Sequence, residues 1–379
     1  MTANVKRAWS ACVKYLKSAD IFLLALCLLC SIFGILLIAT ASARLSGNQV
    51  TLQIGALVLG VVLFVLFSLV DVDSLASRWK ALLVLNVALT LMLFLFGTRV
   101  AGTQAWIRFF GIGIQPSEII KISFILTLAY HIHYLKEYKD LNSFFSVIQL
   151  LLHFGLMAVL VPDLGNATIF MSIFLVMLFL GGLKLRWFLF GLAILVIVIP
   201  LIFHFDLLHT HQYNRIFAPY DPSIDPWLNH WNMQAHRGRM AIGSGQVFGQ
   251  GFGQGPLTQS GFVPEQWTDF ILVSAGEELG FIGAMAVLVL LLLVIFRTFQ
   301  VGAKARDSLS ALVAAGIGAF MLFQTFLNIG MTIGLLPVVG IALPFFSYGG
   351  SSLVTTFIAM GIVCGINMRT VDPWKRRKT

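Results

Sequence analysis

The chain has 379 residues, of which 58% are apolar and only 11% are charged, and its mean hydropathy is +0.91. A water-soluble domain of this length could not enclose so much apolar surface in one core, so the composition excludes a soluble protein and predicts one embedded in lipid. The net charge of +9 does not indicate nucleic acid, because the basic residues are divided among short connections and both ends of the chain. Anionic membrane lipids are the partners that this distribution favours.

Ten apolar segments follow one another along the chain, each near the roughly 20 residues that a helix needs to cross a bilayer. We therefore predict an all-α fold: a polytopic membrane protein with about ten transmembrane helices, forming a single domain over residues 1–379. Eight segments contain no Asp, Glu, Lys or Arg, whereas 115–135 and 270–296 do contain charged residues. The predicted segments are 21–43, 50–70, 81–98, 115–135, 141–161, 164–183, 187–205, 270–296, 308–336 and 343–368.

The positions of Lys and Arg predict the orientation, because short cytoplasmic loops are rich in these residues and outer loops are poor in them. With the N-terminus in the cytoplasm, most of the 25 Lys and Arg residues lie on the cytoplasmic side. We expect residues 1–20 to be a cytoplasmic segment ahead of a retained signal anchor, and 369–379 to be a basic cytoplasmic tail. The basic residues that remain outside are Arg44, Arg99, Arg108, Arg215, Arg237 and Arg239.

Residues 206–268 form one long extracytoplasmic loop, rich in Trp, Phe, His and Gly. Loops of this length are usually functional or disordered, and the aromatic content argues against a solvated linker. We expect the loop to fold over the outer membrane face. Its stretch 243–255 (GSGQVFGQGFGQG) lacks the Gly-Lys-Ser/Thr ending of a phosphate-binding loop, so it is better interpreted as a close turn of backbone that glycine permits.

Glu118 and Lys121 lie inside a predicted span, where each ionisable residue costs roughly 2.5 to 3.5 kcal/mol on insertion scales. Their spacing of three places both on one helix face, where they can neutralise each other. One interpretation is a structural pair that orients this helix against its neighbours. The other is a polar cavity that opens outward, in which Lys121 binds a phosphate.

Asp269 stands immediately before the apolar run of the eighth span. Asp is a favoured N-cap residue, so a capping role and a chemical role are both consistent with this position. Glu277 and Glu278 lie two turns deeper, where we expect hydrogen-bonded or protonated packing elements. In the last span, Pro344 and the paired Gly349 and Gly350 would free backbone groups for a ligand, or allow close helix packing through small residues.

Five motifs occur in order: QPSEIIK at 115–121, VPDLGNA at 161–167, PEQWTDFI at 264–271, GEELGFIG at 276–283 and LPFFSYGGSS at 343–352. With these motifs the chain resembles the SEDS family, which includes RodA, FtsW and SpoVE, over essentially all ten spans. The resemblance implies a peptidoglycan glycosyltransferase in the bacterial cytoplasmic membrane. Such an enzyme polymerises lipid II into β-1,4 glycan strands at the outer face, with a class B penicillin-binding protein as its transpeptidase partner.

The resemblance also implies roles for individual residues. It identifies Asp269 as the catalytic residue, because this is the Asp of the TDFI motif. It implies no certain cofactor, although a divalent cation such as Mg or Mn could share the stabilisation of the diphosphate, and the sequence shows no clear multi-carboxylate cage for one. The residues expected to bind substrate are Arg108, Gln115, Glu118, Lys121, Arg215, Gln234, Thr268, Ser347, Gly349 and Gly350.

Alternative functions stay open at this point. Ten helices with intramembrane charge also describe a transporter, here a lipid II flippase, although its polar residues should then gather near the midplane instead of the outer side. A scaffold without catalytic activity is a third interpretation. Within the family, the compact tails favour the RodA-like elongation branch, which maintains cell shape, over the division and sporulation branches.

Overall fold

The computed structural model describes residues 13, 15–44, 47–100, 103–109, 112–159, 164–205, 210–228 and 230–370. The predicted cytoplasmic segment 1–20 and the basic tail 369–379 therefore lie largely outside the described residues.

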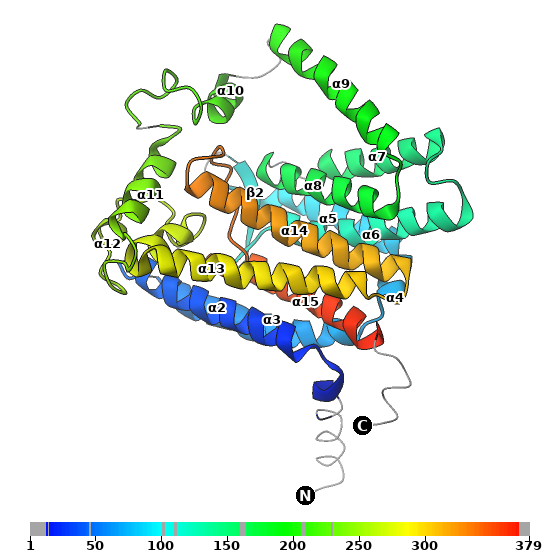
Figure 1. The fold of residues 1–379 in the computed structure, drawn as a ribbon, viewed down its shortest axis with the longest axis horizontal. Coiled ribbons are helices and arrows are strands. Elements are labelled where there is room, and N and C mark those ends of the chain that lie inside the picture. The colour runs from blue at the N-terminus through cyan, green and yellow to red at the C-terminus, as the bar shows by residue number, and fades with distance from the viewer. Residues whose placement is uncertain are drawn as a thin grey trace, which may run out of the picture.

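The described part of the chain contains ten long helices, and each of them overlaps one of the ten predicted segments (Figure 1). The predicted polytopic membrane fold is therefore confirmed. By length and composition, α2, α3, α5, α13, α14 and α15 could each cross a membrane, whereas α7, α8 and α9 contain shorter apolar stretches. The ten are α2 (Ile21–Ala41), α3 (Gln49–Leu69), α5 (Trp79–Phe96), α6 (Pro116–Tyr138), α7 (Phe144–Val159), α8 (Leu164–Gly181), α9 (Leu185–His204), α13 (Ile271–Ala303), α14 (Ser308–Thr332) and α15 (Gly350–Thr370).

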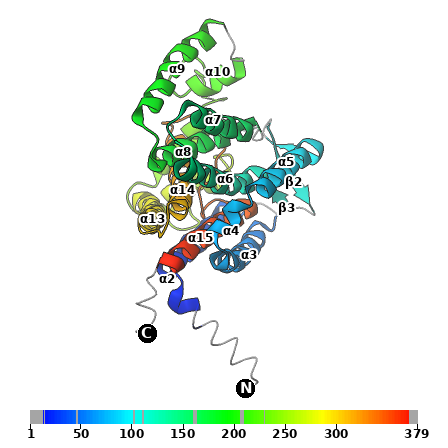
Figure 2. The ribbon, with the colours of Figure 1, turned by 90° about the vertical axis from the view of Figure 1, so that its right-hand side faces the viewer.

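The core of the bundle is formed around α14 and α15. In each of these helices 72% of the residues in the apolar window are buried, against 17% in α3 and α5. Small residues allow the close approach: a Cβ on Gly361 of α15 would lie 2.5 Å from the carbonyl oxygen of Phe64 on α3. Figures 1 and 2 show α9 projecting away from this bundle, and most of its side chains are exposed.

Several short elements were not predicted. A three-stranded antiparallel sheet, β1 (Gly97–Val100), β2 (Thr103–Phe109) and β3 (Ile112–Ile114), connects α5 to α6. It is a small exception to the predicted all-α fold. The long loop contains α10 (Thr210–Phe217), α11 (Met233–Ser244) and α12 (Pro256–Ser260), and α4 (Val72–Ser77) joins α3 to α5.

The last two predicted spans are shorter in the structure. The last span begins at Gly350 and not at residue 343, because Pro344 and the left-handed Phe345 (φ +66°) are incompatible with a continuous helix. The preceding span ends at Thr332 and not at 336, since Gly334 has φ +74°. Residues 333–349 are therefore a non-helical α14–α15 connection.

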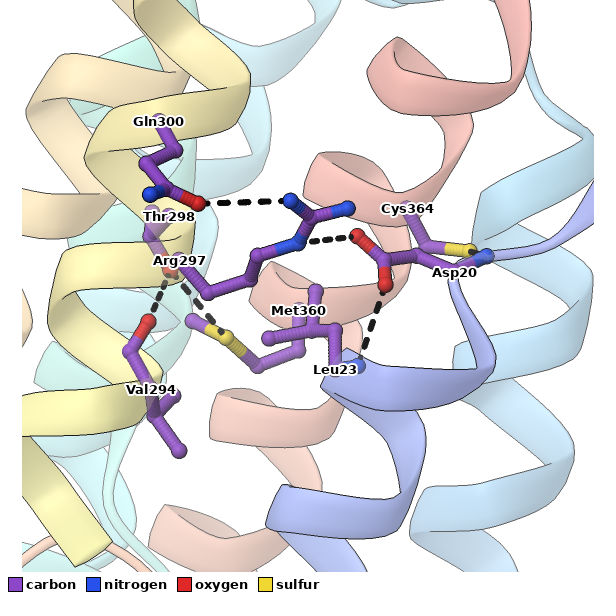
Figure 3. A network of polar contacts seen from close by, with 8 residues as sticks. All are labelled: Asp20, Leu23, Val294, Arg297, Thr298, Gln300, Met360 and Cys364. Carbon is purple, nitrogen blue, oxygen red and sulfur yellow. Dashed lines mark hydrogen bonds and ion pairs between the residues drawn. The ribbon is translucent and has the colours of Figure 1, made fainter.

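A network of polar contacts joins the first and last helices at one end of the bundle (Figure 3). Asp20 caps α2 by accepting from the Leu23 amide at 3.1 Å and pairs with Arg297 of α13 at 2.8 Å. Its own amide donates to the Cys364 sulfur of α15 at 3.3 Å. Beside this network, Arg369 pairs with Asp71 at 3.3 Å. We call this the terminal end of the bundle; α11 and α12 lie at the opposite, loop end (Figure 1).

Candidate active site

Asp269 lies half-buried in the turn that precedes α13. The N-cap residue of α13 is Phe270, which makes no side-chain cap bond, so Asp269 does not occupy the cap position. Its backbone carbonyl accepts a hydrogen bond from Asn328 Nδ2 at 2.8 Å. One carboxylate oxygen lies 3.5 Å from the point where a Cβ would stand on Gly340. The carboxyl group is thus set against the α14–α15 connection.

The α14–α15 connection also contacts two of the arginines that are predicted to lie outside. Arg215 of α10 donates from Nε to the Val338 carbonyl at 2.8 Å. The guanidinium carbon of Arg239, on α11, lies 3.2 Å from the position of a Cβ on Gly334. Val338 and Gly340 are only two residues apart, so Arg215 and Asp269 meet the same short stretch of backbone.

Thr268 and Ser347 are joined directly. The Ser347 hydroxyl donates to the Thr268 carbonyl and accepts from the Leu343 amide at 2.7 Å. One residue further on, the Tyr348 amide donates to the Trp267 carbonyl at 2.8 Å. The two residues that precede Asp269 in this turn are therefore both hydrogen-bonded to the connection.

Glu118 and Lys121 form a buried ion pair at 2.7 Å, and the Lys121 side chain is only 1% exposed. Lys121 also donates to Gln324 Oε1 of α14 at 3.0 Å and lies over the Phe320 ring. Gln324 in turn donates to the Ala342 carbonyl at 2.9 Å. These contacts favour the structural-pair interpretation, and they extend the pair to the same connection that borders Asp269.

The paired glycines of the last motif are packed against α3. Gln53, which is fully buried, donates to the Ser347 carbonyl at 3.2 Å and accepts from the Gly349 amide at the same distance. The Gly349 amide is thus bonded to Gln53. One interpretation of the sequence left this amide free for a ligand, and the structure does not show it free. A Cβ on Gly350 would be in ordinary contact with Ala56 at 3.6 Å.

Three expected substrate residues lie on other elements. The Gln115 backbone amide donates to the Ser351 hydroxyl at 3.3 Å, which places the start of α6 beside that of α15. Arg108 is exposed on β2, opposite Gly113. Gln234 is half-buried on α11. Within the described residues, no hydrogen bond or ion pair joins the side chain of Arg108 or Gln234 to the α14–α15 connection.

Sequence reasoning missed the buried amides of α14. Asn328 is fully buried and donates to both the Asp269 carbonyl and the Ile341 carbonyl, the latter at 2.6 Å. Gln324 lies one helical turn before Asn328 and donates a hydrogen bond to the Ala342 carbonyl. Two carboxamides spaced by four in an apolar span were the available signal, because a buried amide in lipid must have a specific partner.

Over the residues that the structure describes, no cluster of three or more His, Cys, Asp or Glu side chains could hold a metal ion. The divalent cation stays a prediction.

Comparison with known proteins identifies the family. The family model described as cell cycle protein, FTSW_RODA_SPOVE, matches residues 20–371. The chain is 34% identical to the probable peptidoglycan glycosyltransferase FtsW of Bacillus subtilis, covering 94% of this chain and 92% of that protein. It is 32% identical to the peptidoglycan glycosyltransferase MrdB of Escherichia coli, covering 89% and 90%.

Solved structures give the same answer for the fold. The rod shape determining protein RodA of Thermus thermophilus matches with a TM-score of 0.66 at 25% identity, over 93% of this chain and 98% of that one. A chain from a peptidoglycan synthase complex, described as coordinating polymerization and crosslinking, matches with a TM-score of 0.78 at 25% identity, over 93% and 99%. Taken with the motifs and the ten helices, these matches show that the chain belongs to the FtsW, RodA and SpoVE family of multi-pass membrane proteins.

Proposed function

We propose that this chain is a peptidoglycan glycosyltransferase that polymerises lipid II into β-1,4 glycan strands. Relatives that align with about nine tenths of the chain are named peptidoglycan glycosyltransferases. The observation that carries the mechanism is the position of the Asp269 carboxylate beside Gly340, on the stretch of backbone that Arg215 also binds. A base and a cation at one place are what this sugar transfer needs.

The new bond forms between the 4-hydroxyl oxygen of an acceptor GlcNAc and the anomeric carbon of a muramyl unit. The bond that breaks joins that carbon to undecaprenyl diphosphate, so a single displacement inverts the α-linked donor to the β product. A sugar hydroxyl is a weak nucleophile, and a carboxylate within hydrogen-bond reach assists by accepting its proton. Asp269 is the residue that we assign to this role.

The departing diphosphate needs positive charge in a water-poor site. Arg215 donates to the Val338 carbonyl from Nε and not from its two Nη nitrogens, and Arg239 is exposed beside Gly334. We assign the diphosphate to these two arginines. Lys121 receives a positioning role instead, because it is buried and already bonded to Glu118 and Gln324.

The solved complex that the chain resembles is a peptidoglycan synthase, which supports a partnership with a class B penicillin-binding protein that crosslinks the strands. In the same proposal both termini lie in the cytoplasm and Asp269 faces the outer side. FtsW and MrdB relatives match at nearly the same identity, so the role in elongation stays a prediction.

The proposal is tested by incubating the purified protein with fluorescent lipid II, alone and with its transpeptidase partner, and separating the products on a gel. We expect a ladder of glycan strands. Transfer of lipid II across vesicle membranes without polymer would identify a flippase, and neither polymer nor transfer would identify a scaffold. Either result would overturn the proposal.

A further inference from the structure

The outer loop contains a stretch without charge. Residues 240–264 include no Asp, Glu, Lys, Arg or His, within a loop that is predicted to fold over the outer membrane face. Inside this stretch, Gln residues alternate with Gly and with apolar side chains. We call residues 245–253 the Gly-rich loop. Such a composition is unusual for a water-exposed surface and is suited to the boundary between lipid headgroups and acyl chains.

The Gly-rich loop completes the broken helix α13. Gly280 has φ +70° and interrupts the helix, which removes the normal partners of the next two amides. Phe281 and Ile282 instead donate to the carbonyls of Gln246 and Val247, at 2.8 and 3.3 Å. Non-helical backbone at membrane depth requires such partners from protein. The loop is therefore bonded to a part of α13 that lies within an apolar span.

The two glutamates of α13 are satisfied by the same part of the chain. Glu277 accepts from the amides of Leu257 and Thr258 at 2.8 and 2.7 Å, and Glu278 accepts from the Gly253 amide at 3.0 Å. The hydrogen-bonded state predicted for both carboxyl groups is confirmed. Glycine is required for this close approach, because a Cβ on Gly249 would stand 2.2 Å from the Glu278 carbonyl oxygen. The loop is thus fixed in place by main-chain contacts.

The depth of the Gly-rich loop follows from α2. At about 1.5 Å per residue α2 is about 30 Å long, the thickness of a hydrocarbon core. The start of α2 lies at the same depth as Arg297, because Asp20 forms an ion pair with Arg297. The end of α2 contacts the loop, since a Cβ on Gly253 would lie 3.6 Å from the Thr40 methyl carbon. Along α13, Ile282 is about 22 Å from Arg297. The hydrogen bond between Ile282 and Val247 therefore lies roughly 8 Å inside the membrane boundary at the loop end.

The side chains at this depth point away from the protein. Phe248 is 80% exposed and Val247 51% exposed. On the adjoining turn of α13, Phe281 and Ile282 are 62% and 53% exposed, as expected for side chains that face lipid. The apolar surface of the Gly-rich loop is therefore continuous with the lipid-facing surface of the helix.

We propose that the Gly-rich loop is a membrane anchor whose side chains Val247 and Phe248 insert into the acyl-chain boundary of the leaflet at the loop end. The occupant of this surface is lipid. The inference goes beyond the proposed reaction and does not depend on it, because it uses only the depth, the bonding and the exposure of the loop. In this proposal part of the predicted outer loop 206–268 lies within the membrane boundary.

The test uses site-directed spin labels on the full-length protein in phospholipid vesicles without any partner protein. Phe248→Cys carries the label at the proposed anchor, and Trp227→Cys, at a side chain that is 83% exposed in the same outer loop, is the matched control. The natural chain labelled in parallel gives the background from its own cysteines. Power saturation then compares access of oxygen, which concentrates in lipid, with access of a water-soluble nickel chelate.

We expect the label at 248 to be several-fold more accessible to oxygen than to nickel and the label at 227 to show the reverse. Equal nickel access at both positions would place the Gly-rich loop in water and overturn the proposal. A label at 248 that is immobile and inaccessible to both reagents would mean that protein covers the surface, which would also overturn it. Because Phe248 is so exposed, its replacement should not affect folding.

Discussion

The backbone of Asp269 is held by Asn328 and by the turn around Thr268, so its side chain can be changed without removing those bonds. Asp269→Asn keeps the shape but cannot accept a proton, and we expect polymerisation of lipid II to fall by at least about 10²-fold with an unchanged melting temperature. Asp221→Asn, at an exposed carboxylate of the same outer loop, should retain activity. Polymerisation at the normal rate by the Asp269→Asn protein would remove this residue from the mechanism.

Asn328 places Asp269 through the backbone, and Asn328→Ala would leave two buried carbonyls without their donor. A displacement of about 1 Å at a reacting group can cost on the order of 10²-fold, so we expect a fall of that size in kcat with little change in KM for lipid II. The matched control is Asn86→Ala, at an equally buried amide on α5. Similar kinetic losses in both variants would identify Asn328 as a general packing residue.

The Glu118–Lys121 pair predicts a distinctive pattern in a double mutant. Lys121→Met alone leaves an uncompensated buried carboxylate, which typically costs about 3 to 5 kcal/mol, and should lower the melting temperature strongly. Adding Glu118→Gln should restore most of that stability while polymerisation stays reduced, because Gln324 has still lost its lysine partner. Full recovery of activity in the double mutant would show that the pair serves stability alone.

At the scale of elements, the break in α13 depends on one glycine. Gly280 has φ +70°, and a Cβ there would lie 2.3 Å from the Gly249 nitrogen. We expect Gly280→Ala to destabilise the protein by at least about 1 to 3 kcal/mol, through strain and through separation of the Gly-rich loop. Gly155→Ala on α7, where a Cβ would meet nothing within 4 Å, is the control in a thermal unfolding assay. An equal effect of both substitutions would contradict this account.

The membrane helices, which are defined by long apolar segments, could be predicted from the sequence. The short strands and the contacts at the site, which depend on local geometry and packing, could not. Long apolar runs gave all ten helices, because lipid imposes a length and a composition on each span. Strands of three to seven residues carry too little periodicity, which is why β1 to β3 were missed. At the site, the motifs pointed to Asp269, but the partners Asn328 and Gln324 depend on packing between distant segments.

At the scale of the whole molecule, the distribution of basic residues predicts that the terminal end lies in the cytoplasm. A cysteine at Lys139, exposed between α6 and α7, should react with a membrane-impermeant maleimide only after the cells are permeabilised. A cysteine at Trp227 should react in intact cells. The opposite pattern would place Asp269 in the cytosol, where lipid-linked precursor facing outward could not reach it.

The pairing of the first helices with the last has a consequence for biosynthesis. α3 packs on α15 through Gly361, and the buried Gln53 of α3 has its partners at Ser347 and Gly349, nearly three hundred residues later. During translation these early helices enter the bilayer long before the ribosome has made the segments that complete them. Until then a buried amide remains unmatched in lipid. The nascent protein must therefore pass through a loosely assembled stage, in which insertion machinery or membrane chaperones can hold it until the final helix arrives.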